Sequence, residues 1–151
     1  MRVKKDLILH ENSYEIVATQ RIIDRIVLHS MDGFFQSTIE YFKNPQTTVS
    51  SHYLISKGGE IVQMLKDSWT GYHAGGYEIN KRSIGIELED EGKRDTWIYP
   101  RKEIESLQWL VNSLCRKYNI PKDIDHILLH KNISADRADP VGNFKIRWVL
   151  G

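Results

Sequence analysis

A strict alternation of apolar and polar residues over positions 83–89 predicts a β-strand. Successive side chains of a strand point to opposite faces, so the aliphatic residues at every second position from Ile84 would share one face. The other face would carry Gly85 and the carboxylate of Glu87. A glycine inside a strand leaves room for another group to approach the backbone. The same pattern is also typical of an edge strand with solvated acids, and only the histidines elsewhere in the chain favour a functional site here.

Further patterns predict an alternation of strands and helices. Short apolar runs predict strands at 25–30, 51–55, 60–64 and 127–129, and at most a short strand at 7–9. Helical spacing of apolar residues predicts helices at 35–42, 104–118 and 144–150. Asp32 is expected to cap the first of these helices, and Pro100 to begin the second. We therefore predict a single α/β domain over residues 1–151, with a central mixed sheet flanked by helices, an N-terminal arm at 1–24 and a core at 25–150.

Composition and charge narrow the class of protein. The chain has 151 residues, of which 40% are hydrophobic and 27% charged, and its net charge is +1. This balance is that of a globular domain, and we expect no nucleic-acid partner, no membrane partner and a monomer. The single cysteine, Cys115, excludes an internal disulfide and is expected to be a buried thiol. The N-terminus lacks the pattern of a signal peptide, so we expect synthesis in the cytoplasm, with release by another factor if the protein acts outside.

Two histidines share one context, because His29 and His130 each end a short apolar strand just before a loop. Asp139 follows in a loop that contains Pro140. Two imidazoles and one carboxylate, with a fourth position for water, form a catalytic zinc arrangement. His126 and His130 are four residues apart and could bind zinc on a helix, but the apolar residues between them favour a strand. Each histidine taken alone could equally be a structural residue.

Seven segments then resemble, in order and approximate spacing, the type 2 N-acetylmuramoyl-L-alanine amidases. They are Ile26-Val27-Leu28-His29, Ser50-Ser51-His52-Tyr53, Gly59-Glu60-Ile61-Val62-Gln63, Tyr72-His73-Ala74-Gly75, Ser83-Ile84-Gly85-Ile86-Glu87-Leu88-Glu89, His130 and Arg137-Ala138-Asp139-Pro140. The family comprises zinc enzymes related to phage lysozyme-amidases, to amidases of cell-wall recycling and to peptidoglycan recognition proteins. The resemblance implies an amidase-like fold with residues 25–150 as its catalytic core.

The resemblance also implies roles by position. His29, His130 and Asp139 match the three zinc ligands, and Glu87 matches the catalytic glutamate that takes a proton from the attacking water. Arg137 stands where the family usually has lysine. A cation there would stabilise the oxyanion, and because arginine stays protonated its role would be purely electrostatic.

Residues around this set are candidates for substrate binding. His73 resembles a residue of the substrate groove, and Tyr72 and Trp69 are aromatic residues suited to stacking on a sugar or peptide, although ordinary loop packing is the alternative. His52 is a further candidate near the site, with a structural role as the alternative.

Two positions depart from the pattern. Ser51 stands where some relatives carry tyrosine, which favours the recycling-type arrangement with glutamate as the base. Val141 stands where a glycine usually follows the Asp-Pro pair, so the local loop geometry should differ.

The sequence thus predicts a zinc-dependent amidase that cuts the bond between N-acetylmuramic acid and L-alanine in peptidoglycan or muropeptides. We expect a phage or prophage endolysin, with a cytosolic recycling amidase as the alternative. A non-catalytic peptidoglycan-binding module is the rival from another class, and a zinc peptidase on the same scaffold is a weaker option.

Overall fold

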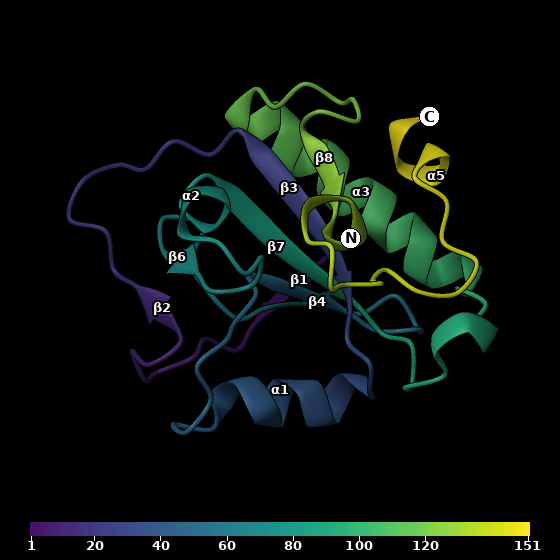
Figure 1. The fold of residues 1–151 in the computed structure, drawn as a ribbon, viewed down its shortest axis with the longest axis horizontal. Coiled ribbons are helices and arrows are strands. Elements are labelled where there is room, and N and C mark those ends of the chain that lie inside the picture. Colours follow the sequence, from purple (N-terminus) through teal and green to yellow (C-terminus); the bar gives the residue numbers. More distant parts are fainter.

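The computed structural model describes residues 1–151 and contains a mixed six-stranded sheet with strand order β1-β5-β4-β7-β3-β8 (Figure 1). A separate pair, β2 and β6, is antiparallel. The strands are β1 (Val3–Lys5), β2 (Tyr14–Glu15), β3 (Arg25–Ser30), β4 (Tyr53–Ile55), β5 (Ile61–Gln63), β6 (Thr70–Gly71), β7 (Ser83–Leu88) and β8 (Ile127–Leu129). Within the large sheet only the β4–β5 hairpin is antiparallel, which confirms the predicted hairpin and mixed sheet.

Helices cover both faces of this sheet, with α1 on one side and α3 on the other (Figure 1). The helices are α1 (Phe35–Lys43), α2 (Tyr77–Asn80), α3 (Arg101–Tyr118), α4 (His130–Ile133) and α5 (Arg147–Leu150), and a 3₁₀ turn, η1, spans Arg94–Thr96. The larger apolar cluster joins α3 to the sheet and includes the buried Cys115, while a smaller one packs α1 against Leu54 and Val62. No helix is both long and apolar enough to cross a membrane.

The strand with the clear alternation, β7, lies at the centre of the sheet between β4 and β3. Ile84, Ile86 and Leu88 are fully buried in the cluster under α3, whereas Gly85 and Glu87 face the α1 side. The edge-strand interpretation of this pattern is therefore wrong. Polar residues on the second face are retained here because that face holds a cavity rather than a packed core.

The start of α1 differs from the prediction. Asp32 makes no cap; it has a positive φ of 49° and forms an ion pair with Arg94. Instead, Oε1 of Glu89 accepts a hydrogen bond of 3.0 Å from the backbone N–H of Phe35. A carboxylate at a helix N-terminus satisfies a free N–H group and interacts favourably with the helix dipole. The cap comes from the loop after β7, more than fifty residues away in the sequence.

The N-terminal arm is more ordered than its weak pattern indicates. Its strand lies at Val3–Lys5, not at 7–9, and pairs in parallel with β5. Arg21 fastens the end of the arm by donating to the backbone carbonyls of Asp67 and Ser83, at 2.8 and 3.1 Å. Burial lowers the pKa of this guanidinium to about 10, and it remains a cation at neutral pH.

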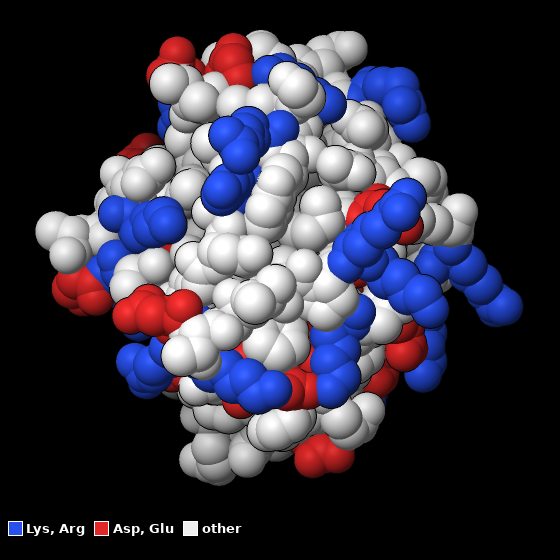
Figure 2. Space-filling model, turned by 90° about the vertical axis from the view of Figure 1, so that its right-hand side faces the viewer, with Lys and Arg blue, Asp and Glu red and all other residues white.

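The charges are distributed in small groups. Figure 2 shows basic and acidic side chains interspersed on one face around an area of other residues. This arrangement agrees with the net charge of +1.

Candidate active site

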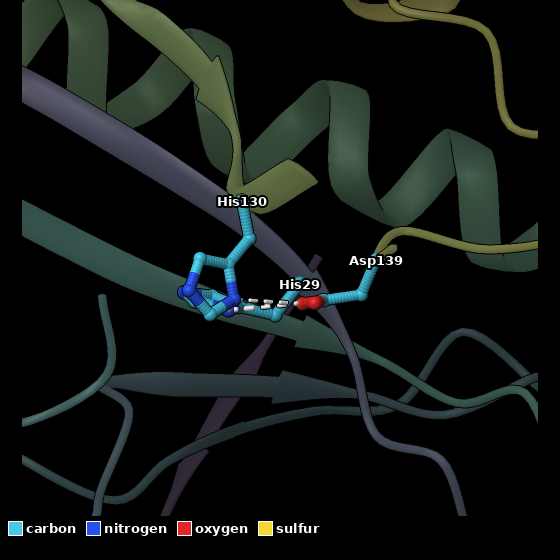
Figure 3. A group of neighbouring side chains, drawn as sticks. All are labelled: His29, His130 and Asp139. Atoms are coloured by element: carbon cyan, nitrogen blue, oxygen red, sulfur yellow. Dashed lines mark hydrogen bonds and ion pairs between the residues drawn. The ribbon is translucent and has the colours of Figure 1, made fainter. Parts of the chain in front are cut away.

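His29, His130 and Asp139 converge on one point at the carboxyl ends of β3 and β8 (Figure 3). The two strands are parallel neighbours, so residues that end them are brought together at one edge. Nδ1 of His29 lies 3.0 Å from Nδ1 of His130, and each of these atoms lies 3.2 Å from Oδ2 of Asp139. Both imidazoles are buried. Three atoms with lone pairs at such mutual distances could hold a metal ion.

The loop that carries Asp139 is tied to the elements on either side of it. The backbone N–H of Lys131, in α4, donates to the carbonyl of Asp139 at 2.8 Å. The N–H of Val141 donates to Oγ of Ser30, at the end of β3, at 3.3 Å. Gly142 takes the positive φ of 70° and lies against the backbone of Trp97, where a Cβ atom would come within 2.3 Å of a carbonyl oxygen. The glycine that this turn needs is thus one position later than the sequence comparison led us to expect.

Electrostatics at the three-residue cluster favour an ionised carboxylate. Burial alone would raise the pKa of Asp139, but contacts with His130 and His29 outweigh burial and hold the pKa below its usual range. The aspartate therefore offers a negative charge to a cation at any pH near neutrality.

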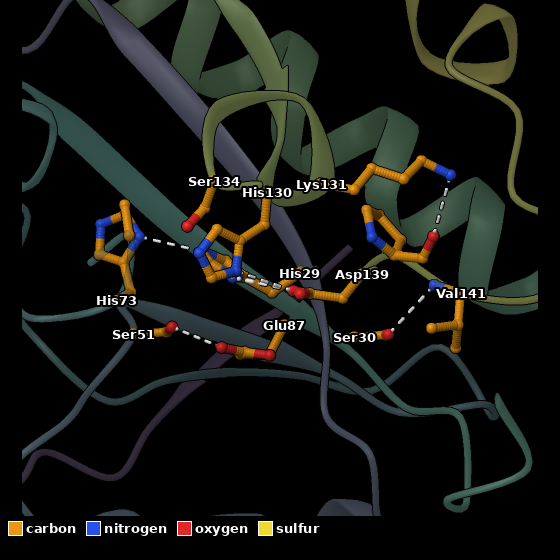
Figure 4. A network of polar contacts seen from close by, with 12 residues as sticks. His29, Ser30, Ser51, His73, Glu87, His130, Lys131, Ser134, Asp139 and Val141 are labelled. Carbon is orange, nitrogen blue, oxygen red and sulfur yellow. Dashed lines mark hydrogen bonds and ion pairs between the residues drawn. The ribbon is translucent and has the colours of Figure 1, made fainter. Parts of the chain in front are cut away.

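Glu87 lies on β7 directly opposite His29 of β3 in the sheet register. Oγ of Ser51 donates a hydrogen bond of 2.8 Å to Oε1 of Glu87 (Figure 4). Burial raises the pKa of this carboxyl, and the charge of His29 and the bond from Ser51 partly oppose that shift. A carboxylate with a raised pKa, next to a cluster that could hold a metal ion and open to a cavity, is suited to accept and return a proton.

A cavity of about 830 Å³ opens over the cluster between α1 and the loop that follows α4. It is lined by all five predicted metal and catalytic residues, namely His29, His130, Asp139, Glu87 and Arg137. Tyr72 and His73 also line it. Arg137 is exposed and forms no ion pair, so its charge is available to a ligand in the cavity.

His73 contacts His29 of β3 and Ser83 of β7 through its two ring nitrogens. Its Nδ1 is 3.0 Å from Nε2 of His29, and its Nε2 is 3.3 Å from Oγ of Ser83 (Figure 4). Burial, followed by the charges of His29 and His52, lowers the pKa of His73 well below its usual value, so this imidazole is neutral. The resemblance indicated that His73 lies near the site, but the sequence gave no signal of its contact with His29.

The structure does not bring His52 and Trp69 to the cavity. His52 is completely buried, accepts the N–H of Gly85 at 3.1 Å and contacts Arg21 at 3.1 Å, so its side chain is not exposed to the cavity. Trp69 stacks on Tyr14 with ring centroids 4.7 Å apart and is not part of the lining. His126 also lies apart, paired with Asp123 at 2.7 Å. These positions favour the structural alternatives for His52, Trp69 and His126.

Comparison with known proteins places this arrangement in a family. The sequence model described as N-acetylmuramoyl-L-alanine amidase matches residues 19–142. The chain belongs to the N-acetylmuramoyl-L-alanine amidase family. This match includes the five predicted metal and catalytic residues and confirms the resemblance inferred from the seven sequence segments.

Individual members of the amidase family are similar over most of the chain. N-acetylmuramoyl-L-alanine amidase A of Achromobacter lyticus is 31% identical over 96 residues, which is 63% of this chain and 52% of that protein. The 1,6-anhydro-N-acetylmuramyl-L-alanine amidase AmpD of Citrobacter freundii is 33% identical over 127 residues, 76% of this chain and 65% of that protein. A solved structure of a mutant endolysin from Bacillus subtilis has a TM-score of 0.70 and 25% identity, and covers 89% of this chain and 87% of that one. The chain thus spans about half to two thirds of the length of these two curated amidases.

Proposed function

We propose that this chain is a zinc-dependent N-acetylmuramoyl-L-alanine amidase that hydrolyses the amide bond between N-acetylmuramic acid and L-alanine. One observation carries the proposal: three candidate metal-ligand atoms converge beside the half-buried carboxylate of Glu87 in a chain of this family. A peptidoglycan strand or a muropeptide would occupy the cavity above them.

The donor set supports zinc as the metal. Zinc prefers a tetrahedral set of nitrogen, sulfur and carboxylate ligands, and bonds of about 2.0–2.1 Å place such ligand atoms about 3.3–3.4 Å apart. The three candidate atoms already lie 3.0–3.2 Å from one another. His29, His130 and Asp139 would hold the ion and leave one side open to the cavity. When bound, zinc polarises a carbonyl and makes water a nucleophile near neutral pH.

The residues of the chain would supply the proton transfer and part of the charge stabilisation. Glu87 would accept a proton from the attacking water and return it to the leaving amine of L-alanine. Arg137 would stabilise the negative charge that develops on the carbonyl oxygen, since its guanidinium is free of internal partners. Tyr72, on the wall of the cavity, would contact the substrate by stacking.

Two biological roles fit this chemistry. An endolysin that acts on the cell wall is our first proposal, and the endolysin structure among the comparisons supports it. The similarity to AmpD, a 1,6-anhydro-N-acetylmuramyl-L-alanine amidase, favours a muropeptide-recycling amidase as the second candidate.

The test offers intact cell walls and soluble 1,6-anhydro-muropeptides side by side to the purified protein, after its zinc content is measured. We expect about one zinc per chain and release of the peptide from at least one substrate, with Glu87→Gln retaining zinc but losing nearly all cleavage. Preference for walls would favour the endolysin role, and preference for the soluble fragments the recycling role. Binding of walls without zinc and without cleavage would instead make the chain a non-catalytic binding module. Cleavage of peptides that lack the sugar would point to a zinc peptidase.

A further inference from the structure

The imidazole of His29 contacts the candidate metal site with one nitrogen and His73 with the other. Nδ1 of His29 belongs to the three-atom cluster, whereas Nε2, on the opposite side of the ring, lies 3.0 Å from Nδ1 of His73. In Figure 4 the two rings follow one another away from Asp139. Whether Nδ1 of His29 can bind a metal depends on which of its two nitrogens carries the hydrogen, because a ligand nitrogen must be free of one.

Hydrogen bonds within the protein favour a hydrogen on Nε2 of His29 rather than on Nδ1. The chain of contacts ends at the carbonyl oxygen of Ile79, which can only accept, and Oγ of Ser83 donates to it at 2.7 Å. Because the hydroxyl hydrogen is used there, Oγ of Ser83 faces His73 with a lone pair, and Nε2 of His73 must be the donor across 3.3 Å. With that hydrogen on Nε2, Nδ1 is the acceptor nitrogen of the His73 ring. It accepts the hydrogen on Nε2 of His29, which leaves Nδ1 of His29 bare.

Gly85 makes this arrangement possible. A Cβ atom at this position of β7 would come within 2.7–2.9 Å of atoms of the His73 ring. Real Cβ contacts are essentially never this short, so any larger residue at position 85 would displace the imidazole. A glycine inside a strand is expected to allow a close approach of another group. Here that group is the imidazole of His73, which packs directly against the backbone of Gly85.

The second histidine of the cluster has no such support. Nε2 of His130 is buried and has no hydrogen-bond partner in the protein. Both imidazoles contact Asp139 through Nδ1, but only His29 also has a protein partner at Nε2. Loss of the contact with His73 would leave neither Nε2 atom of the cluster with a partner in the protein.

We propose that His73 is a positioning residue, which accepts the Nε2–H of His29 and so holds His29 in the tautomer and orientation that present Nδ1 to the metal. The inference rests on the proposed function, because it assigns His73 a role toward the zinc ligands. It also replaces the expectation that His73 contacts the substrate. Partners of this kind typically contribute about 10- to 100-fold to metal affinity or activity.

The test measures zinc affinity by competition with a chelator in four variants. His73→Leu removes the acceptor and fills similar space, whereas His73→Asn restores an acceptor oxygen near the place of Nδ1. Gly85→Ala displaces the ring from outside, and His126→Leu is the matched control at a histidine away from the site. We expect zinc affinity to fall about 10- to 100-fold in His73→Leu and Gly85→Ala. It should be largely recovered in His73→Asn and unchanged in His126→Leu.

A second readout uses neither metal nor activity. Nitrogen NMR of the metal-free protein near pH 7.5 should show His29 with its hydrogen on Nε2, and this preference should be lost in His73→Leu. Circular dichroism of each variant verifies folding. Unchanged zinc affinity in His73→Leu, with only KM altered, would overturn the inference in favour of a substrate contact. A hydrogen on Nδ1 of His29 in the wild type would overturn it as well. Absence of zinc from the wild type would defeat the proposed function, while the tautomer of His29 would still test the inference.

Discussion

At the scale of single residues, Glu87 shows how one hydrogen bond can prepare a group for proton transfer. Oε1 accepts the hydroxyl of Ser51, and no other side chain donates to the carboxylate. Fixing one oxygen restricts the rotation of the carboxylate, so the other oxygen keeps one direction toward the cavity. Positioning of this kind lowers the entropy loss on reaching the transition state.

Ser51→Ala should therefore lower kcat with little effect on KM. A hydrogen bond to a charged group contributes about 1.5–3 kcal/mol, which corresponds to roughly a 10- to 100-fold loss of rate. The measurement is steady-state hydrolysis of the preferred substrate by zinc-loaded protein. Ser37→Ala is the matched control, because Ser37 also lines the cavity but donates to the carbonyl of Phe34 instead. Equal kinetics in the two variants would show that Ser51 has no part in orienting Glu87.

The same scale shows what the sequence could and could not reveal about the site. The positions of His29 and His130 at strand ends predicted that the two side chains meet if their strands are neighbours, and the structure shows that β3 and β8 are parallel neighbours. The contact of His73 with His29 depends on the space that Gly85 of β7 leaves for the His73 ring. A contact of this kind cannot be inferred from the spacing of apolar and polar residues. His52 was assigned to the substrate because the pattern gives proximity along the chain but not depth of burial.

At the scale of elements, Glu89 joins three parts of the fold. Its Oε1 accepts the N–H of Phe35 at the start of α1, and its Oε2 accepts the N–H of Lys57 in the β4–β5 turn at 2.7 Å. Its own N–H donates to Ile55 of β4 at 3.0 Å. The buried carboxylate thus fixes the helix that forms one wall of the cavity.

Replacing Glu89 by alanine should lower the free energy of unfolding by about 3–5 kcal/mol, since two charge-assisted hydrogen bonds from the N–H groups of Phe35 and Lys57 are lost. Urea unfolding followed by circular dichroism measures the change. Glu105→Ala is the matched control, because Glu105 forms only a surface ion pair with Arg101 in α3. Its loss should cost about 0.5 kcal/mol or less. A similar small effect in both variants would mean that Glu89 does not hold α1 in place.

The helices and strands were predicted correctly where the pattern of apolar residues is long. They were missed or misplaced where tertiary contacts determine whether an element forms and where it begins. The apolar stripe of α3 and the alternation of β7 are periodic over enough residues to be recognised. Elements such as β2, β6 and α4 span only two to four residues, too few for a period to appear. The N-cap at Asp32 was wrong because a carboxylate distant in sequence occupies that place.

At the scale of the whole molecule, covering both sheet faces forces several acidic residues into the interior. Glu103 of α3 is fully buried, and neither of its carboxylate oxygens has a hydrogen-bond partner. Burial, then the nearby charges of Glu89 and Asp90, raises the pKa of Glu103 to about 9. This group is therefore protonated in the folded protein at neutral pH, whereas it would be ionised in the unfolded chain.

Stability should consequently fall as pH rises from about 4.5, the ordinary pKa of the group, to about 9, its pKa in the folded state. Over this range the unfolded chain releases a proton that the folded protein keeps, and the contribution to unfolding free energy falls by up to about 1.4 kcal/mol per pH unit. Glu103→Gln is neutral in both states and lacks this contribution. Thermal unfolding of metal-free protein at pH 5, 7 and 9 should give a variant whose Tm exceeds that of the wild type by an amount that grows with pH. Glu105→Gln should run parallel to the wild type, because Glu105 is exposed. A constant difference between Glu103→Gln and the wild type at all three pH values would mean that Glu103 is ionised in the fold and has a partner there.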